Sequence, residues 1–181
     1  MIRKSVVLES LYKVIPSYIN NDDVLFFCIG TDRSTGDCLA PMVGSKLIEK
    51  GYRNVIGTLD NPIHAKNLEE AISRLPKNKF IIAIDACLGK EENVGKVNIK
   101  KGSILAGVGV GKNLPPVGDY KIEAIVNVDE RNNGLNYYVL QSTRLSIVTR
   151  MANDIAEGIS SRFSLHKKEN KVNQLVLSYI G

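Results

Sequence analysis

The chain has 181 residues; 44% are hydrophobic and 24% are charged, and 24 Lys and Arg outweigh 19 Asp and Glu. This is the composition of one globular domain over residues 1–181, and no apolar run approaches the roughly 20 residues that span a bilayer. The basic residues are scattered, so we expect no nucleic-acid partner and no membrane partner. The N-terminal residues lack the apolar core of a secretion signal, and three cysteines in no metal-binding spacing fit reduced thiols, so we expect a cytoplasmic protein.

Apolar residues recur at helical spacing in some segments and as short continuous runs in others. The continuous runs are typical of strands that are covered on both faces. The expected helices are 5–19, 38–50, 63–74 and a long helix to residue 163 capped by Ser142 or Thr143, and the expected strands are 24–29, 54–59, 79–85 and 122–128.

Four segments carry weaker patterns. Residues 94–106 suggest a short antiparallel hairpin, and the Gly- and Pro-rich residues 107–119 suggest a long loop. Residues 136–141 are compatible with a strand or with a helix entry. Residues 166–181 are polar and then apolar, which indicates a tail that docks on the body of the protein or on a partner chain.

Strands that alternate with helices predict a mostly parallel sheet covered by helices on both faces, an α/β fold. Ligands bind such sheets beyond the carboxyl ends of the strands, and two carboxylates fall there. Asp85 ends the strand 79–85, and Asp37 lies in the loop after the strand 24–29. If these strands are neighbours, one carboxyl pKa should rise and the other fall, so that the pair could act as acid and base or hold a divalent metal.

Plainer interpretations stay open at these positions. Asp37 could cap the helix that follows it, and Asp85 could bond loop amides. Cys38 and Cys87 each lie near a candidate aspartate, so that a pair with His64 would be an alternative nucleophile. Arg33 and Arg144 could bind a substrate carboxylate, or form ordinary ion pairs.

Gly107, Gly109 and Gly111 form a glycine-rich segment before Lys112. The spacing fails both the P-loop pattern and the dinucleotide pattern, and Leu114 with two prolines prevents an immediate helix. We therefore expect no nucleotide cofactor. The glycines instead suggest a wall of the crevice that lets a peptide backbone approach closely and donates amides to an oxyanion.

Long motifs of the chain closely resemble those of the YyaC-type sporulation proteins of spore-forming Firmicutes. The resemblance extends from about residue 20 to 160. The motifs that carry it are residues 28–44, 57–65, 80–89, 114–119, 125–128 and 139–145.

That family is similar to the germination protease, which degrades small spore proteins, and more remotely to the hydrogenase maturation endopeptidases. The resemblance implies a three-layer α/β/α sandwich, phosphorylase/hydrolase-like and hydrogenase-maturation-protease-like. It also places two catalytic aspartates on Asp37, within Thr35-Gly36-Asp37, and on Asp85, within Ile84-Asp85-Ala86. Residues 100–120 contain no His to match the metal ligand of the hydrogenase enzymes, so we expect no metal.

The sequence thus predicts a sporulation-associated peptidase that uses Asp37 and Asp85, with Arg33, His64 and the three glycines binding substrate. Its partner would be a peptide or a small spore protein in the sporulating cell or spore compartment, and a homo-oligomer is left open. The alternative is a sporulation protein that keeps the fold and only binds a peptide or partner.

Overall fold

The computed structural model describes residues 4–105, 115–130 and 135–165. The strands are β1 (Val24–Cys28), β2 (Val55–Ile56), β3 (Phe80–Gly89), β4 (Val97–Lys101) and β5 (Tyr120–Val128). The helices are α1 (Lys4–Val14), α2 (Leu39–Glu49), α3 (Leu68–Ser73), α4 (Asn136–Gln141) and α5 (Leu145–Arg162), with 3-10 turns at Asn21–Asp23 and Glu91–Asn93.

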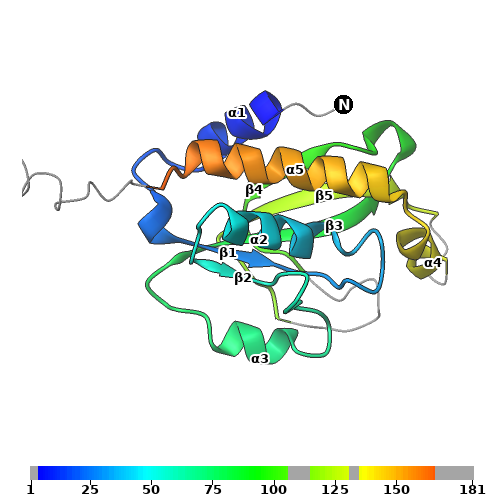
Figure 1. The fold of residues 1–181 in the computed structure, drawn as a ribbon, viewed down its shortest axis with the longest axis horizontal. Coiled ribbons are helices and arrows are strands. Elements are labelled where there is room, and N and C mark those ends of the chain that lie inside the picture. The colour runs from blue at the N-terminus through cyan, green and yellow to red at the C-terminus, as the bar shows by residue number, and fades with distance from the viewer. Residues whose placement is uncertain (1–3, 106–114, 131–134, 166–181) are drawn as a thin grey trace, which may run out of the picture.

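The five strands form one sheet in the order β2-β1-β3-β5-β4. The first four of these are parallel to their neighbours, and β4 joins the far edge antiparallel to β5. Helices α1, α2 and α5 lie on one side of the sheet and α3 lies on the other (Figure 1). We call these sides the α5 face and the α3 face. The expected α/β sandwich with a mostly parallel sheet is confirmed.

The two faces hold separate clusters of buried side chains, because successive residues of a strand point to opposite sides. Phe26, Ile82 and Ile84 belong to the cluster on the α5 face, which also contains the inward sides of α1, α2 and α5. Phe27 and Ala83 belong to the smaller cluster under α3. All five residues of β1 are buried, as its continuous apolar run predicts.

Three predicted elements are shorter in the structure. Helix α1 ends at Val14 because Pro16 has no amide hydrogen with which to continue it. Strand β2 ends at Ile56 because Gly57 turns the chain with φ of +91°. Helix α3 begins only at Leu68, because the Asn67 side chain accepts from the His64 amide and donates to the Pro62 carbonyl, which holds a turn there.

Two local predictions are wrong in detail. Residues 97–101 form a single strand that pairs with β5, whereas a hairpin within 94–106 was expected. The residue before α5 is Arg144, which forms no side-chain cap. Ser142 and Thr143 instead donate their hydroxyls to carbonyls of α4, from Tyr138 and Val139 respectively. Residues 136–141 form a helix, one of the two options.

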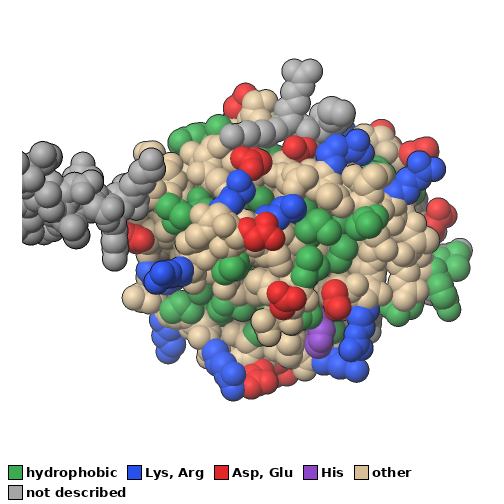
Figure 2. Space-filling view, viewed as in Figure 1, with side chains coloured by type: hydrophobic (Ala, Val, Ile, Leu, Met, Phe, Trp, Pro, Cys, Tyr) green, Lys and Arg blue, Asp and Glu red, His purple; other side chains and the backbone are tan. Residues whose placement is uncertain are grey.

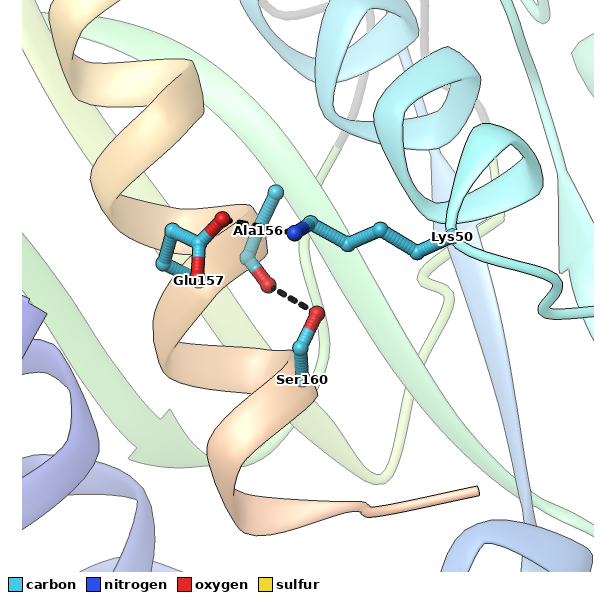
Figure 3. A network of polar contacts seen from close by, with 4 residues as sticks. All are labelled: Lys50, Ala156, Glu157 and Ser160. Carbon is cyan, nitrogen blue, oxygen red and sulfur yellow. Dashed lines mark hydrogen bonds and ion pairs between the residues drawn. The ribbon is translucent and has the colours of Figure 1, made fainter. Parts of the chain in front are cut away.

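Polar contacts also join α2 to α5 (Figure 3). The Lys50 ammonium lies 2.6 Å from a Glu157 carboxylate oxygen, and the Ser160 hydroxyl donates to the Ala156 carbonyl within α5. On the face shown in Figure 2, basic and acidic side chains are interspersed. No helix among the described residues is long and apolar enough to cross a bilayer.

Candidate active site

Asp85 lies in β3 at the point where β1 ends. The last paired residues of β1 and β3 are Cys28 and Ile84, and the Ile29 amide still donates to the Ile84 carbonyl at 2.8 Å. Because Ile82 and Ile84 point to the α5 face, Asp85 points to the α3 face. Its Oδ1 accepts from the Ala86 amide at 2.8 Å, which orients the carboxyl group.

The loop that follows β1 brings Asp37 to the same end of the sheet. The Thr31 amide donates to the Asp37 carbonyl at 3.2 Å, so the loop closes on its own start. A Cβ at Gly30 would lie only 2.0 Å from that carbonyl oxygen, which is why the close approach needs glycine. Strands β1 and β3 are also neighbours in the sheet, which was the condition for Asp37 and Asp85 to lie at one site.

Helix α4 holds this loop from the other side. The Gly36 amide donates to the Leu140 carbonyl at 2.8 Å. A Cβ at Gly36 would lie 2.9 Å from Leu140 Cδ2, so the contact leaves no room for a side chain. The backbone next to Asp37 is thus held between the end of β1 and α4.

The two carboxyl groups interact electrostatically. Burial raises the pKa of Asp85 well above its usual value, and the charge of Asp37 raises it further. Burial also raises the pKa of Asp37, whereas the nearby Ser34 hydroxyl lowers it. The expectation that one pKa rises while the other falls is therefore wrong, because both groups lose water around them. The larger upward shift on Asp85 still distinguishes the two.

Neither plainer interpretation of Asp37 and the cysteines gains support. Cys38, directly before α2, forms no side-chain cap, and no hydrogen bond joins the Asp37 carboxyl to the first turn of that helix in the described chain. Burial raises the pKa of the Cys38 thiol, and burial with the charge of Glu123 raises that of Cys87 to about 12. Protonated thiols are poor nucleophiles, so both groups are unsuited to thiolate catalysis. For Asp85, the bonded amide is that of its own neighbour, Ala86.

The predicted substrate-binding residues lie at different places. His64 follows Ile63, which is bridged to Ile29, so its backbone lies at the same end of the sheet as the aspartates; its Nδ1 accepts from the Lys66 amide at 3.3 Å. Arg33 is exposed in the loop before Asp37, and Arg144 is exposed before α5.

Gly107, Gly109 and Gly111 lie outside the described residues. The residues that flank their segment, Ile104 and Val117, are bridged to each other and belong to the cluster on the α3 face. Asp85 points to this face too. The role predicted for the glycines stays a prediction.

Three polar residues near the aspartates were missed by the sequence analysis. Glu123 of β5 is paired with Asp85 of β3, and its charge adds to the rise of the Asp85 pKa. Lys121 lies 3.0 Å from Glu123, and both are partly buried. Ser34 is buried, and its Oγ has no hydrogen-bond partner of standard geometry in the described chain although it lies close enough to affect Asp37. Glu123 could be found only from the register of β3 and β5, which the local sequence does not determine.

The donor set does not match a metal site built from two acids and a histidine. Within the described residues, no group of three His, Cys, Asp or Glu side chains could hold a metal ion.

A family model for proteins of unknown function, DUF1256, matches residues 2–158. The chain belongs to the DUF1256 family. It is 45% identical over 157 residues to "Uncharacterized protein YyaC" of Bacillus subtilis, which covers 84% of this chain and 75% of that protein. The family resemblance inferred from the motifs is thereby confirmed.

Solved structures show the same fold in another family. The [NiFe] hydrogenase maturation protease HycI from Thermococcus kodakarensis superposes with a TM-score of 0.51 and 14% identity, over 88% of this chain and 99% of that chain. At this identity the likeness shows the fold alone. The α/β arrangement of DUF1256 is thus that of the hydrogenase maturation proteases.

Proposed function

We propose that this DUF1256 chain is a sporulation-associated peptidase, similar to the germination protease, that hydrolyses peptide bonds with Asp37 and Asp85. The observation that carries the proposal is the electrostatic coupling of two partly buried carboxyl groups, Asp37 in the loop after β1 and Asp85 in the neighbouring strand β3 beside the end of β1. The fold shared with a hydrogenase maturation protease and the relationship to a protein of a Bacillus species support it.

The unequal environments suggest how the roles are divided. Asp85, with the larger rise of its pKa, is the acid: its protonated carboxyl donates to the carbonyl oxygen of the substrate. Asp37 is the base, because the Ser34 hydroxyl favours its ionised form. Glu123, next to Asp85 on β5, helps to keep Asp85 protonated.

The reaction then proceeds in two proton transfers. Asp37 takes a proton from a water molecule while the oxygen of that water attacks the peptide carbonyl carbon. The hydrogen bond from Asp85 stabilises the developing oxyanion. The C–N bond breaks as Asp37 passes the proton that it took from water to the amine nitrogen, which leaves a carboxylic acid and an amine and restores the Asp37 carboxylate. One water is consumed for each bond that is cleaved.

Substrate binding is assigned to residues around the same end of the sheet. Arg33 and His64, from loops at this end of the sheet, together with Gly107, Gly109 and Gly111, are proposed to bind a peptide or a small spore protein in the sporulating cell. Because Asp85 points to the α3 face, we expect an extended chain to approach from that side.

The test is cleavage of small spore proteins by the purified chain and by Asp37→Asn and Asp85→Asn. We expect each variant to lose about a hundredfold or more in kcat/KM, the usual contribution of a general acid or base. Asp32→Asn is the matched control, since Asp32 is an exposed aspartate of the same loop, and its activity should be unchanged. Thermal melting checks that all variants fold.

Cleavage retained in both Asn variants would refute the two-aspartate mechanism. Tight binding of the spore protein without cleavage, in the native chain and in both variants, would instead establish the alternative of a binding protein on a peptidase fold.

A further inference from the structure

A cavity of about 560 Å³ lies away from the aspartates, at the opposite edge of the sheet from β4. Neither Asp37 nor Asp85 lines it. Its walls come from α2, β2 and the loop after β2, and the lining residues that matter here are Ile48, Glu49, Val55, Ile56, Asp60 and Ile63. The cavity is therefore a groove that runs beside the edge strand β2.

The backbone of β2 is open toward this groove. Strand β2 is the last in the sheet order, so no described strand pairs with its outer side. Val55 is paired with Phe26, whose amide donates at 2.9 Å to the carbonyl of the preceding residue, Asn54. In a parallel pair this geometry turns the amide and carbonyl of Val55 itself away from β1. The edge thus presents a free donor and acceptor for another strand.

The groove has an apolar wall and an acidic rim. Ile48 of α2 is 46% exposed and lines the groove, so its side chain is available to an occupant. Glu49 and Asp60 are both exposed at the rim. A fitting occupant is an extended segment that carries apolar side chains for the wall and positive charge near the acids.

The chain itself leaves the described body next to this edge. The carbonyl of Phe163, just after α5, accepts from the buried Tyr52 hydroxyl at 2.7 Å. Leu165 lies against Gly51, with its Cδ1 3.4 Å from the position that a Cβ there would take. Gly51 and Tyr52 lie a few residues before β2, so the described chain ends, at Leu165, near the amino end of the open strand.

We propose that the C-terminal segment 174–180 of this chain docks on the outer edge of β2 as a sixth strand and fills the groove. The segment contains Leu175, Val176, Leu177, Tyr179 and Ile180, which favour a strand and supply apolar side chains to both faces.

The stretch between Leu165 and the segment fits the rim and the distance. Residues 166–173 include Lys167, Lys168 and Lys171 against one acid, Glu169, which complements Glu49 and Asp60. Eight extended residues reach about 26 Å, whereas Val55 is four residues from Gly51, or about 13 Å at most. The spacer therefore reaches the edge with slack.

Attachment in the same chain explains why so short an edge could suffice. Strand β2 has only two residues, and a free peptide would gain few hydrogen bonds there. A tethered segment binds at an effective concentration of the order of millimolar, so a weak strand addition is still populated. The same docking would cover an edge that otherwise invites pairing between molecules.

Amide hydrogen exchange of the full chain tests the docking from the side of the tail. In the variant Leu175→Gln/Leu177→Gln, we expect the amides of residues 174–180 and of residues 53–57 to exchange about tenfold faster than in the native chain. Asn170→Gln/Asn173→Gln is the matched control in the spacer, and it should exchange like the native chain.

The groove supplies the reciprocal test. Ile48→Gln should speed exchange of residues 174–180 in the same way, whereas Val6→Gln, at a residue of α1 with 51% exposure, should not. Native and variant chains in which 174–180 exchange equally fast would overturn the proposal. So would protection of the tail without any change at 53–57, which would place the tail elsewhere.

Protein concentration separates a tail docked in its own chain from one exchanged with a second copy. Protection that stays constant across about a hundredfold range of concentration supports docking within one chain. Protection that grows with concentration, together with a dimer in sedimentation, would assign the groove to a second copy and overturn the proposal as stated.

Discussion

The two faces of the sheet are built differently. Among the described residues, 27 buried side chains pack into one cluster on the α5 face, whereas the cluster on the α3 face has eight. The α3 face also carries the polar positions of the strands, Asp85 and Glu123, where the sheet continues past its apolar part. We expect packing on the α5 face to supply most of the free energy of unfolding, so that the α3 face can hold charged groups that lower it.

The largest difference should appear between neighbouring residues of β1. Phe26 on the α5 face packs edge-on against Tyr52 and Phe163, with ring centroids 6.0 and 5.6 Å away. Phe26→Ala should lower the free energy of unfolding by about 4–5 kcal/mol, and Phe27→Ala by about 3 kcal/mol, since the thinner layer can close in on the space. Chemical denaturation measures both. Equal losses would show that the two faces contribute alike.

The pH dependence of stability tests whether Asp85 on the α3 face lowers the free energy of unfolding. Asp85 has a raised pKa in the folded state, so the folded state holds the proton more tightly and stability falls as pH rises. Asp85→Asn should therefore unfold about 2–6 °C higher than the native chain at pH 8, a gain of about 1–2 kcal/mol. The gain should vanish below about pH 4, where the unfolded aspartate is protonated too.

Calorimetry at the two pH values checks this prediction, with Asp37→Asn as the matched variant of the same sign and smaller size. A gain that is the same at both pH values, or larger in acid, would contradict a carboxyl group held in its protonated form.

The smallest effects should come from the ion pairs on the outer surfaces of the two faces. Lys50→Met breaks the link between α2 and α5, and Arg74→Met breaks a pair with Glu70 within α3. We expect losses of less than about 1 kcal/mol for Lys50 and less than about 0.5 kcal/mol for Arg74. Repeating the melts in 1 M salt should remove most of both losses (~3 Å screening length). A larger loss at Arg74 would reverse the ranking of the faces.

The strands and the long helix were predictable because their buried positions are occupied by apolar residues at the spacing of a strand or a helix. The apolar run of β1 and the helical spacing of α5 match the structure closely, whereas β3 continues past the predicted end at Asp85 to Gly89, because residues 85–89 still pair with β5. Boundaries set by one backbone contact were not predictable: β2 stops at Gly57, where a Cβ would lie 2.0 Å from the Cys28 carbonyl oxygen. That contact joins segments that are distant in sequence.

The candidate site divides in the same way. Asp37 and Asp85 could be chosen from sequence because each follows an apolar run, and the rule for parallel sheets places both at one end, although β3 itself continues past Asp85. Glu123 could not, because its place beside Asp85 depends on the register of β3 and β5. The prediction that one of the two carboxyl pKa values falls was also wrong, since the burial that raises the pKa of Asp37 depends on the packing around its loop.

The bond from the Gly36 amide to the Leu140 carbonyl ties the two halves of the chain together at the candidate site. The position of Asp37 therefore depends on α4, a short helix that lies about a hundred residues later in the chain, just before α5. Whatever shifts that helix, whether a ligand, a partner or a substitution on its outer side, must carry the carboxyl group along with it. The two carboxyl groups are thus anchored differently: Asp85 belongs to the sheet itself, whereas the backbone of Asp37 is held both at the end of β1 and by α4.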